Sequence, residues 1–161
     1  INAVTPVYSD GKIYYTSGYD AGGGMLELSP DGKSITPKWS DRNLDGQHHG
    51  IILHEGYLYG TAHNASREML ALSLATGEIA WRTKEISQSV VIFADDMLYA
   101  YEGPTKGIVS LIKTTPEGFT RTGQFRITEG NGKHWAHPTI ANGRMYIRRN
   151  GLLFAYDIAA K

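Results

Sequence analysis

The sequence predicts an all-β fold, a β-propeller built from four blades, and three observations lead to it. Four tyrosines recur at intervals of 45, 40 and 47 residues: Tyr14, Tyr59, Tyr99 and Tyr146. A second series of aromatic residues recurs at intervals of 42 and 44 residues: Trp39, Trp81 and Phe125. No stretch carries apolar residues at helical spacing. Repeats of about 40 to 45 residues that hold four short strands are typical of propeller blades.

Each repeat opens with a strand, a tight turn and a second strand that carries the tyrosine. The turns are Asp10-Gly11, Glu55-Gly56, Asp95-Asp96 and Asn142-Gly143. Gly and Asn suit a two-residue hairpin because they tolerate the positive φ angles that such turns require. The acidic pair of the third repeat replaces the usual Asp-Gly, and we interpret it as turn chemistry.

A third and a fourth strand complete each repeat. The third strands are expected at residues 25–29, 69–73, 108–113 and 152–157. Turns at residues 30–32, 75–77 and 116–118 lead into fourth strands that end on the second aromatic series. The blades then span approximately residues 3–40, 47–83, 87–126 and 134–161. The last blade is incomplete, because the sequence stops at Ala159-Ala160-Lys161, where its outer strand should begin.

Charge and composition exclude several classes of protein. Sixteen Lys and Arg balance sixteen Asp and Glu, so the chain lacks the basic field that nucleic-acid binding needs. There is no cysteine, which excludes disulfides, thiolate zinc sites and thiol nucleophiles. No apolar run approaches the roughly 18 residues that span a bilayer. The first residues lack the order of a signal peptide and a Met, so we interpret the start as processed or truncated.

One repeat resembles a known family. The segment from Leu70 to Trp81 reads LALSLATGEIAW and is similar to the "ALDxxTGxxxW" repeat of propellers related to quinoprotein alcohol dehydrogenases. That superfamily contains eight-bladed dehydrogenases dependent on pyrroloquinoline quinone (PQQ), and also an outer-membrane assembly lipoprotein that binds no quinone. The resemblance covers the whole chain and is specific for the fold, but it says little about activity.

Two further segments resemble bacterial PQQ-like propeller proteins, which are often labelled dehydrogenases or polyvinyl alcohol dehydrogenase-like. Residues 47–60 are similar to an "HHGG…GYLYG" stretch, and residues 135–157 are similar to "WAHP…NGRLYLR…LLAYD". This resemblance implies that the chain is the C-terminal half of an eight-bladed ring, with the missing outer strand supplied by the N-terminal part. It also implies export to the periplasm or cell surface.

Candidate ligand-binding residues lie just before the first strand of two blades. These are His48 and His49 in one blade, and Trp135 and His137 in another. The first strand of a blade lines the central channel, so these side chains are expected near one mouth of it. Neutral imidazoles are good ligands for transition metals, which makes a site of His48, His49 and His137 one hypothesis. Alternatively they hydrogen-bond loops and seal the channel, and the one-residue offset between the two motifs argues against metal binding.

Other polar residues have simpler interpretations. Arg148 is a further ligand candidate, since Arg binds carboxylates through two hydrogen bonds, but stacking or pairing at a blade edge is the alternative. His54, His63 and His134 are interpreted as solvated or locally bonded. The triplet Gly22-Gly23-Gly24 has no phosphate-loop context and is interpreted as a flexible loop between strands. Asp157 is expected to cap the turn that follows it.

Two functions are consistent with these observations. The first is a binding or scaffold propeller that presents loops at the channel mouth to a protein, a glycan or a small molecule. The second is a PQQ-dependent dehydrogenase acting on an alcohol or sugar, with this chain as part of the pocket. That chemistry needs a Ca²⁺-bound quinone and a carboxylate base, and the related alcohol dehydrogenases also carry an adjacent cysteine pair. No motif for the base is visible here, and no catalytic residue is assigned.

Overall fold

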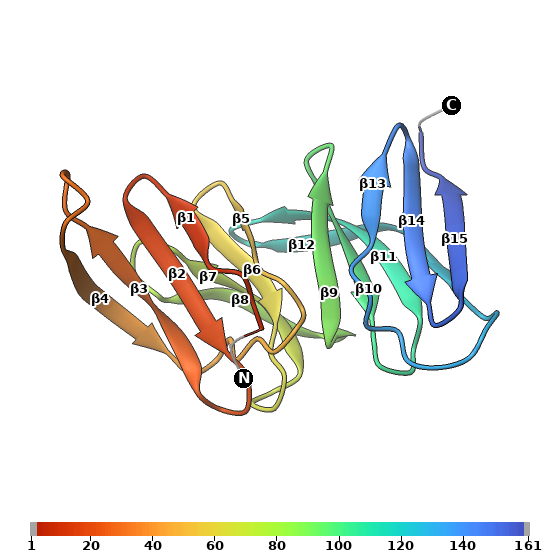
Figure 1. Cartoon of the computed structure of the whole chain (residues 1–161), viewed down its shortest axis with the longest axis horizontal. Helices are drawn as coiled ribbons and strands as arrows, with labels where there is room; N and C mark the ends of the chain where they lie inside the picture. The colour runs from red at the N-terminus through yellow and green to blue at the C-terminus, as the bar shows by residue number, and fades with distance from the viewer. Residues whose placement is uncertain (1–2, 160–161) are drawn as a thin grey trace.

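The computed structural model describes residues 3–159, which form fifteen strands in four antiparallel sheets (Figure 1). Each of the first three sheets has four strands and the last has three, in the order of the chain. The strands are β1 (Val7–Ser9), β2 (Lys12–Ser17), β3 (Gly22–Leu28), β4 (Ile35–Asp41), β5 (Ile52–His54), β6 (Tyr57–Thr61), β7 (Glu68–Ser73), β8 (Ile79–Ser87), β9 (Ser89–Ala94), β10 (Met97–Glu102), β11 (Ile108–Thr115), β12 (Gly118–Arg126), β13 (Thr139–Ala141), β14 (Arg144–Arg149) and β15 (Leu152–Asp157).

This architecture confirms the predicted fold class, including the incomplete last sheet. The expected end of that blade at Ala160 and Lys161 lies outside the described residues. Within residues 3–159 there is no helix of the length and apolar character needed to cross a membrane.

The hairpin turns form as the sequence predicts. Both central residues have positive φ in each of the four turns between the first and second strands. In the first turn these angles are 47° at Asp10 and 76° at Gly11, and in the third they are 52° at Asp95 and 56° at Asp96. Turns of this kind match the right-handed twist of the strands that they join. Asp95 and Asp96 therefore adopt the same turn conformation as Asp-Gly in the first repeat, which confirms the interpretation of the acidic pair as turn residues.

The hydrophobic core is divided into three layers, each between two successive sheets. Tyr14 and Met25 of the first sheet pack with Leu58, Leu70 and Leu72 of the second. The opposite face of the second sheet, with Tyr59 and Met69, packs against the third sheet in the same way. The third layer joins the last two sheets. Because side chains alternate between the faces of a strand, each inner sheet contributes to two layers.

The aromatic landmarks link neighbouring sheets. The Trp39 indole N–H donates to the carbonyl oxygen of Leu74 at 3.2 Å, and the Trp81 N–H donates to that of Thr115 at 2.9 Å. Both bonds run from the fourth strand of one sheet to the next sheet. Tyr146 differs from its three counterparts, because it lies on the face of the last sheet opposite Met145 and Ile147 and is half-buried. The two end sheets also hold exposed apolar side chains, among them Tyr8, Tyr15, Leu152 and Leu153.

The glycine triplet is not a loop, and this corrects the prediction from the sequence. Gly22, Gly23 and Gly24 begin β3 and pair with residues of β2. A Cβ atom on Gly23 would collide with the carbonyl oxygen of Tyr15, and one on Gly24 would lie 2.7 Å from that of Trp39. The glycines therefore permit a close approach of three strands, which is one of the roles of glycine inside a sheet.

A buried carboxylate fixes the loops at one end of the first two sheets. Asp45 is fully buried and accepts hydrogen bonds from the backbone N–H groups of Asp20 at 3.2 Å, His63 at 2.7 Å and Asn64 at 3.0 Å, with Ala65 at 3.4 Å. Asp20 belongs to the β2–β3 loop and the other donors to the β6–β7 loop. A charged acceptor shared by several amides is stronger than a neutral one. Asp45 therefore holds three separate loops together.

We expect Trp81→Ala to destabilise the protein by about 3 kcal/mol. The substitution removes ring contacts to Tyr59 and Phe119 and the hydrogen bond to the neighbouring sheet. Chemical denaturation followed by circular dichroism measures the change. Thr120→Ala, at an exposed position of β12, is the control and should change the free energy of unfolding by no more than about 0.5 kcal/mol. Equal effects of the two variants would contradict the inter-sheet role of Trp81.

Asp45→Ala should also destabilise the protein, by about 2 to 4 kcal/mol, because it leaves several backbone amides without an acceptor. Hydrogen exchange should increase first at the amides of the β6–β7 loop. Asp157→Ala is the matched control, since Asp157 is exposed and accepts one bond, from the Ala159 N–H. If Asp45→Ala unfolds no more easily than this control, Asp45 does not organise the loops.

Candidate functional site

The candidate site lies at one end of the sheets, which we call the site end. Successive strands in each sheet run in opposite directions. The loop between the second and third strands and the segment that leads to the next sheet therefore leave from the same end. The loops between second and third strands lie there, including the tight turn Asn150-Gly151, whereas the hairpin turns between first and second strands, such as Asp10-Gly11, lie at the opposite end. The four candidate residues before β5 and β13 belong to the site end.

Three histidines and a tryptophan form a cluster of rings at the site end. The His48 and His49 ring centroids are 4.2 Å apart, and that of His63 lies 5.8 Å from His49. The Trp135 ring lies 5.2 Å from His48. We call His48, His49, His63 and Trp135 the ring cluster. It joins residues of the β4–β5, β6–β7 and β12–β13 segments.

His137 is attached to the ring cluster through the backbone. Its Nε2 atom donates a hydrogen bond to the carbonyl oxygen of His48 at 2.7 Å. It also lies against Gly50, where a Cβ atom would come within 3.2 Å of the imidazole. Gly50 has a φ of 74°, a conformation that favours glycine. The structure thus brings His48, His49, Trp135 and His137 together, as the sequence suggested.

His63 is a member of the cluster that sequence analysis missed. It was interpreted as a solvated or locally bonded histidine, yet its ring also contacts that of Tyr19, at 5.2 Å between centroids. Its backbone N–H is bound by Asp45, which places the β6–β7 loop beside the β4–β5 segment. The repeat alignment offered no signal for this position, because the loops after the second strands differ in length and sequence.

Two imidazole nitrogens of the cluster are buried without a hydrogen-bond partner among residues 3–159. They are Nδ1 of His49 and Nδ1 of His63. An unpaired polar atom in such a place costs stability unless a water or a ligand bonds to it. His49 is almost fully buried, with 1% of its surface exposed, whereas Trp135 is 46% exposed. The cluster therefore combines buried polar atoms with an accessible aromatic surface.

Two imidazoles of the cluster, those of His48 and His49, favour the neutral form. Burial lowers the pKa of His49 to about 3, and repulsion from His48, His63 and His137 acts in the same direction. Burial also lowers the pKa of His48, which is less enclosed, with smaller contributions from His63 and His137. A neutral imidazole has one nitrogen that donates and one that accepts a hydrogen bond. His48 and His49 thus present polar nitrogens that favour the uncharged state.

A cavity of about 300 Å³ adjoins the ring cluster where the four sheets converge. His48 and His137 line it, together with Thr5 and with small or aliphatic residues from the first strands or the segments before them. These lining residues are Ala3, Val4, Thr5, Gly50, Ile51, Ile52, Val91 and Ile92. Contributions from the first three sheets and from the segment that leads to β13 place the cavity at the centre of the arrangement. The imidazoles thus lie at its rim and aliphatic side chains along its wall.

Arg148 does not take part in this cluster by any contact that the structure shows. It is exposed and its Nε donates to the carbonyl oxygen of Asn150 at 2.9 Å, within its own turn. Its neighbour Arg149 has the more extended role, because it donates to the carbonyl oxygens of Thr128, Glu129 and Gly132. Arg149 thereby ties the β12–β13 segment to the last sheet. Sequence analysis did not assign this role.

The remaining residues agree with their simpler interpretations. His134 is buried, and its Nδ1 lies 2.6 Å from the hydroxyl oxygen of Tyr101, so it is locally bonded. The His54 ring contacts that of Phe93 in a tilted arrangement, with centroids 4.5 Å apart. The Ala159 N–H donates to the Asp157 carboxylate at 3.2 Å, which confirms the expected cap.

The described residues do not form a metal centre. Among residues 3–159, no group of three or more His, Asp or Glu side chains has an arrangement that could hold a metal ion. This finding overturns the hypothesis of a metal site made by His48, His49 and His137. The physical reason is visible at His137, whose Nε2 is occupied by the His48 carbonyl.

The carboxylates at the site end do not fit a Ca²⁺-bound quinone. Asp45 accepts bonds from backbone amides with both of its oxygens. Asp41 does the same, binding the N–H groups of Asn43 and Leu44 at 2.8 Å. Glu102 is buried and paired with Lys106 at 2.7 Å. Within the described part of the chain, these three carboxylates serve to hold loops rather than to bind a cation or accept a substrate proton.

Comparisons with known proteins support the fold. No family model matches the chain, and no curated protein matches it. Among solved structures, the chain is similar to BamB from Moraxella catarrhalis, with 13% identity and a TM-score of 0.65 over 95% of the chain. It is also similar to a chain of the Mitotic Checkpoint Complex, with 12% identity and a TM-score of 0.70 over 93% of the chain. A computationally designed protein, Ika4, matches 98% of the chain at 9% identity and a TM-score of 0.58.

The chain covers different fractions of these three matched structures. The chain spans 42% of the BamB chain and 48% of the chain from the Mitotic Checkpoint Complex, but 91% of Ika4. The chain thus corresponds to less than half of the two larger structures. The likeness at these identities concerns the fold, and on that basis the chain has the fold of a β-propeller.

Proposed function

We propose that this propeller is a binding module, and that its ligand occupies the ring cluster and the adjoining cavity. The observation that carries the proposal is the pair of buried, unpartnered nitrogens, Nδ1 of His49 and Nδ1 of His63, in a cluster that also exposes Trp135. Ligand sites combine apolar side chains with converging polar groups, and this cavity has both, with Ile51, Ile52 and Val91 beside His48 and His137. Loops from several sheets, held by Asp45, supply these groups.

The chemistry of the cluster favours an uncharged ligand with hydroxyl groups, a glycan or a related small molecule. Neutral imidazole nitrogens accept hydrogen bonds from hydroxyls, and burial keeps His49 neutral. The half-exposed face of Trp135 offers an apolar surface on which a ring can stack. The Lys133 ammonium lies 4.4 Å from the centre of this ring and covers part of it. A protein partner remains the alternative occupant of the same loops.

The second hypothesis, a PQQ-dependent dehydrogenase, finds less support in these residues. The resemblance of the repeats to quinoprotein propellers favours it. Against it, the buried carboxylates Asp41, Asp45 and Glu102 are occupied by backbone amides or a lysine. The fourth buried carboxylate among residues 3–159, that of Glu68, lies 3.7 Å from Arg82 and 4.0 Å from Lys84. We therefore assign no catalytic residue and no cofactor to this chain. Further blades as partners, and a location in the periplasm or at the cell surface, remain part of the proposal, and they rest on the same resemblance.

Ligand binding is tested by saturation-transfer NMR against a panel of mono- and oligosaccharides, followed by calorimetry on those that bind. We expect saturable binding, which Trp135→Ala weakens about ten-fold, or roughly 1.4 kcal/mol, through loss of ring stacking. His48→Ala should weaken it as well. His54→Ala is the control and should leave affinity unchanged, because the His54 ring contacts Phe93 at the opposite end of the sheets. If neither Trp135→Ala nor His48→Ala weakens binding, the ligand binds at another place on the protein.

The neutral state of His49 predicts a dependence of stability on pH. An unfolded histidine gains its proton near pH 6.5, whereas His49 in the fold does so near pH 3. Between these values the unfolded state binds more protons, so stability falls as the pH is lowered, by about 1.4 kcal/mol per pH unit from this residue. We expect a loss of about 2 kcal/mol between pH 6.5 and pH 5, measured by urea denaturation.

His49→Gln removes the titrating group and should make the slope between pH 6.5 and pH 5 smaller. NMR of the imidazole resonances provides an independent measurement, because the His49 signals should not titrate above pH 4. If His49 titrates near pH 6.5, its imidazole is hydrated, and water enters the ring cluster in solution.

A further inference from the structure

A cavity of about 410 Å³ opens at the site end between the second and third sheets, each of which has four strands. The β6–β7 loop, the end of β8 with the connection to β9, and the β10–β11 loop surround it. Its lining combines three cationic side chains with three hydroxyl groups: Arg67, Lys84, Lys106, Ser66, Ser87 and Thr105. No Asp or Glu is among the described residues that line it.

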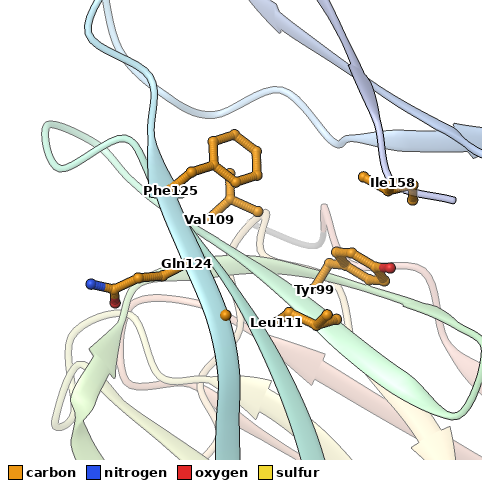
Figure 2. Close-up of a pocket in the computed structure, with 7 residues that line it drawn as sticks. Tyr99, Val109, Leu111, Gln124, Phe125 and Ile158 are labelled. Carbon is orange, nitrogen blue, oxygen red and sulfur yellow. The ribbon is translucent and has the colours of Figure 1, made fainter. Parts of the chain in front are cut away.

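A cavity between the third and last sheets has a different chemistry. Figure 2 shows Phe125, Val109 and Leu111 on one side of this cavity and Ile158 across from them. Apolar side chains therefore form most of its wall, as expected for a space between two packed sheets. The basic lining at the site end thus follows from the residues of its own loops, and a gap between sheets does not by itself produce it.

The Lys106 ammonium is held at the basic cavity by a buried carboxylate. Its Nζ donates to Glu102 Oε2 at 2.7 Å and to Ser87 Oγ at 2.8 Å. Glu102 is 2% exposed and also accepts a bond from the backbone N–H of Ser87 at 3.3 Å. An ammonium group has three N–H donors, and these bonds use two of them. One donor of Lys106 therefore remains for an acceptor in the cavity, in a place that Glu102 and Ser87 determine.

Arg67 and Lys84 add positive charge that the chain balances only in part. Glu68 lies 3.7 Å from Arg82 and 4.0 Å from Lys84, whose side chain is 85% exposed. Within residues 3–159 the Arg67 guanidinium forms no ion pair. Together with Lys106, these cations number four against two carboxylates, Glu68 and the one that holds Lys106. The difference, four minus two, leaves two positive charges in excess around the cavity.

Two residues that line the cavity have a backbone conformation that few residues other than glycine adopt. The φ angle is 60° at Arg67 and 40° at Gln88. Such conformations persist only where the surrounding structure holds them, and they are frequent at ligand sites. The Gln88 carbonyl accepts a bond from the Gly103 N–H at 3.1 Å, and its side-chain amide donates to the His63 carbonyl at 3.3 Å. Contacts between the loops therefore hold the rim of the cavity in place.

We propose that this cavity binds a tetrahedral oxyanion group, a phosphate or a sulfate, either as a free anion or as part of a small molecule. The Arg67 guanidinium can donate two parallel hydrogen bonds to the oxygens of such a group, and Lys84 and Lys106 supply compact charges. The hydroxyls of Ser66 and Thr105 add uncharged donors. The site shares no residue with the ring cluster and does not depend on the proposed function.

NMR titration of the ¹⁵N-labelled 161-residue chain tests this proposal at neutral pH. The probes are inorganic phosphate, inorganic sulfate and glycerol 3-phosphate, with sodium chloride keeping the ionic strength constant. We expect saturable shifts of the amides at residues 66–67, 87–88 and 103–106, and none at His48 and His49. Tighter binding of glycerol 3-phosphate than of inorganic phosphate assigns the site to an organic ester, whereas equal affinities assign it to the free anion. Absence of saturable shifts with all three probes overturns the proposal.

Variants that remove one exposed cation locate the site. Arg67→Gln and Lys84→Gln should each lower the affinity about five-fold, the effect of losing one exposed charge pair, and should keep the melting temperature. Lys33→Gln is the matched control, because Lys33 is exposed in the β3–β4 turn at the opposite end of the first sheet. It should bind as the unmodified chain does. Equal affinities of Arg67→Gln, Lys84→Gln and Lys33→Gln would overturn the assignment of the anion to this cavity.

Discussion

The structure depends on one constraint, which is that each inner sheet has two apolar faces. Leu58 and Leu72 of the second sheet point to the first sheet, while Tyr59 and Met69 point to the third. Such a sheet is stable only between two others, because either face would otherwise expose apolar area to water. The sheets therefore stack face to face in chain order. The same constraint explains the exposed apolar side chains of the two end sheets, such as Leu153, whose outer faces meet no other sheet formed by residues 3–159.

The stacking of the sheets also creates the site. His48 and His137 are 89 residues apart in the sequence, yet they are hydrogen-bonded, because the segments before β5 and β13 both reach the centre of the arrangement. The sheets bring such segments close, but they do not fix the loops themselves. That role falls to buried carboxylates and to arginine, with Asp45 holding the loop of His63 and Arg149 holding the segment before Trp135. Charged groups thus position loops on which burial favours the neutral form of His48 and His49.

The fold was predictable because its signals are local and repeated. A turn such as Asn142-Gly143 needs positive φ angles, and a tyrosine at a fixed distance from each turn marks the strand that follows. The triplet from Gly22 to Gly24 was misinterpreted as a loop because glycine is required there by contacts with other strands, which the local sequence does not show. The glycines are needed where the backbones at Tyr15 and Trp39 approach β3, and composition alone does not distinguish this from a loop.

The candidate site was predictable only in part, for the same physical reason. His48, His49, Trp135 and His137 belong to segments that begin the blades, so the repeat itself places them near the channel. His63 and Asp45 lie in loops that vary between repeats, and their proximity follows from hydrogen bonds formed only in the folded chain. Arg148 and Arg149 show the limit most clearly. They are adjacent on β14, and successive side chains of a strand point to opposite faces. Arg148 therefore donates to a carbonyl of its own turn, whereas Arg149 donates to carbonyls of the β12–β13 segment.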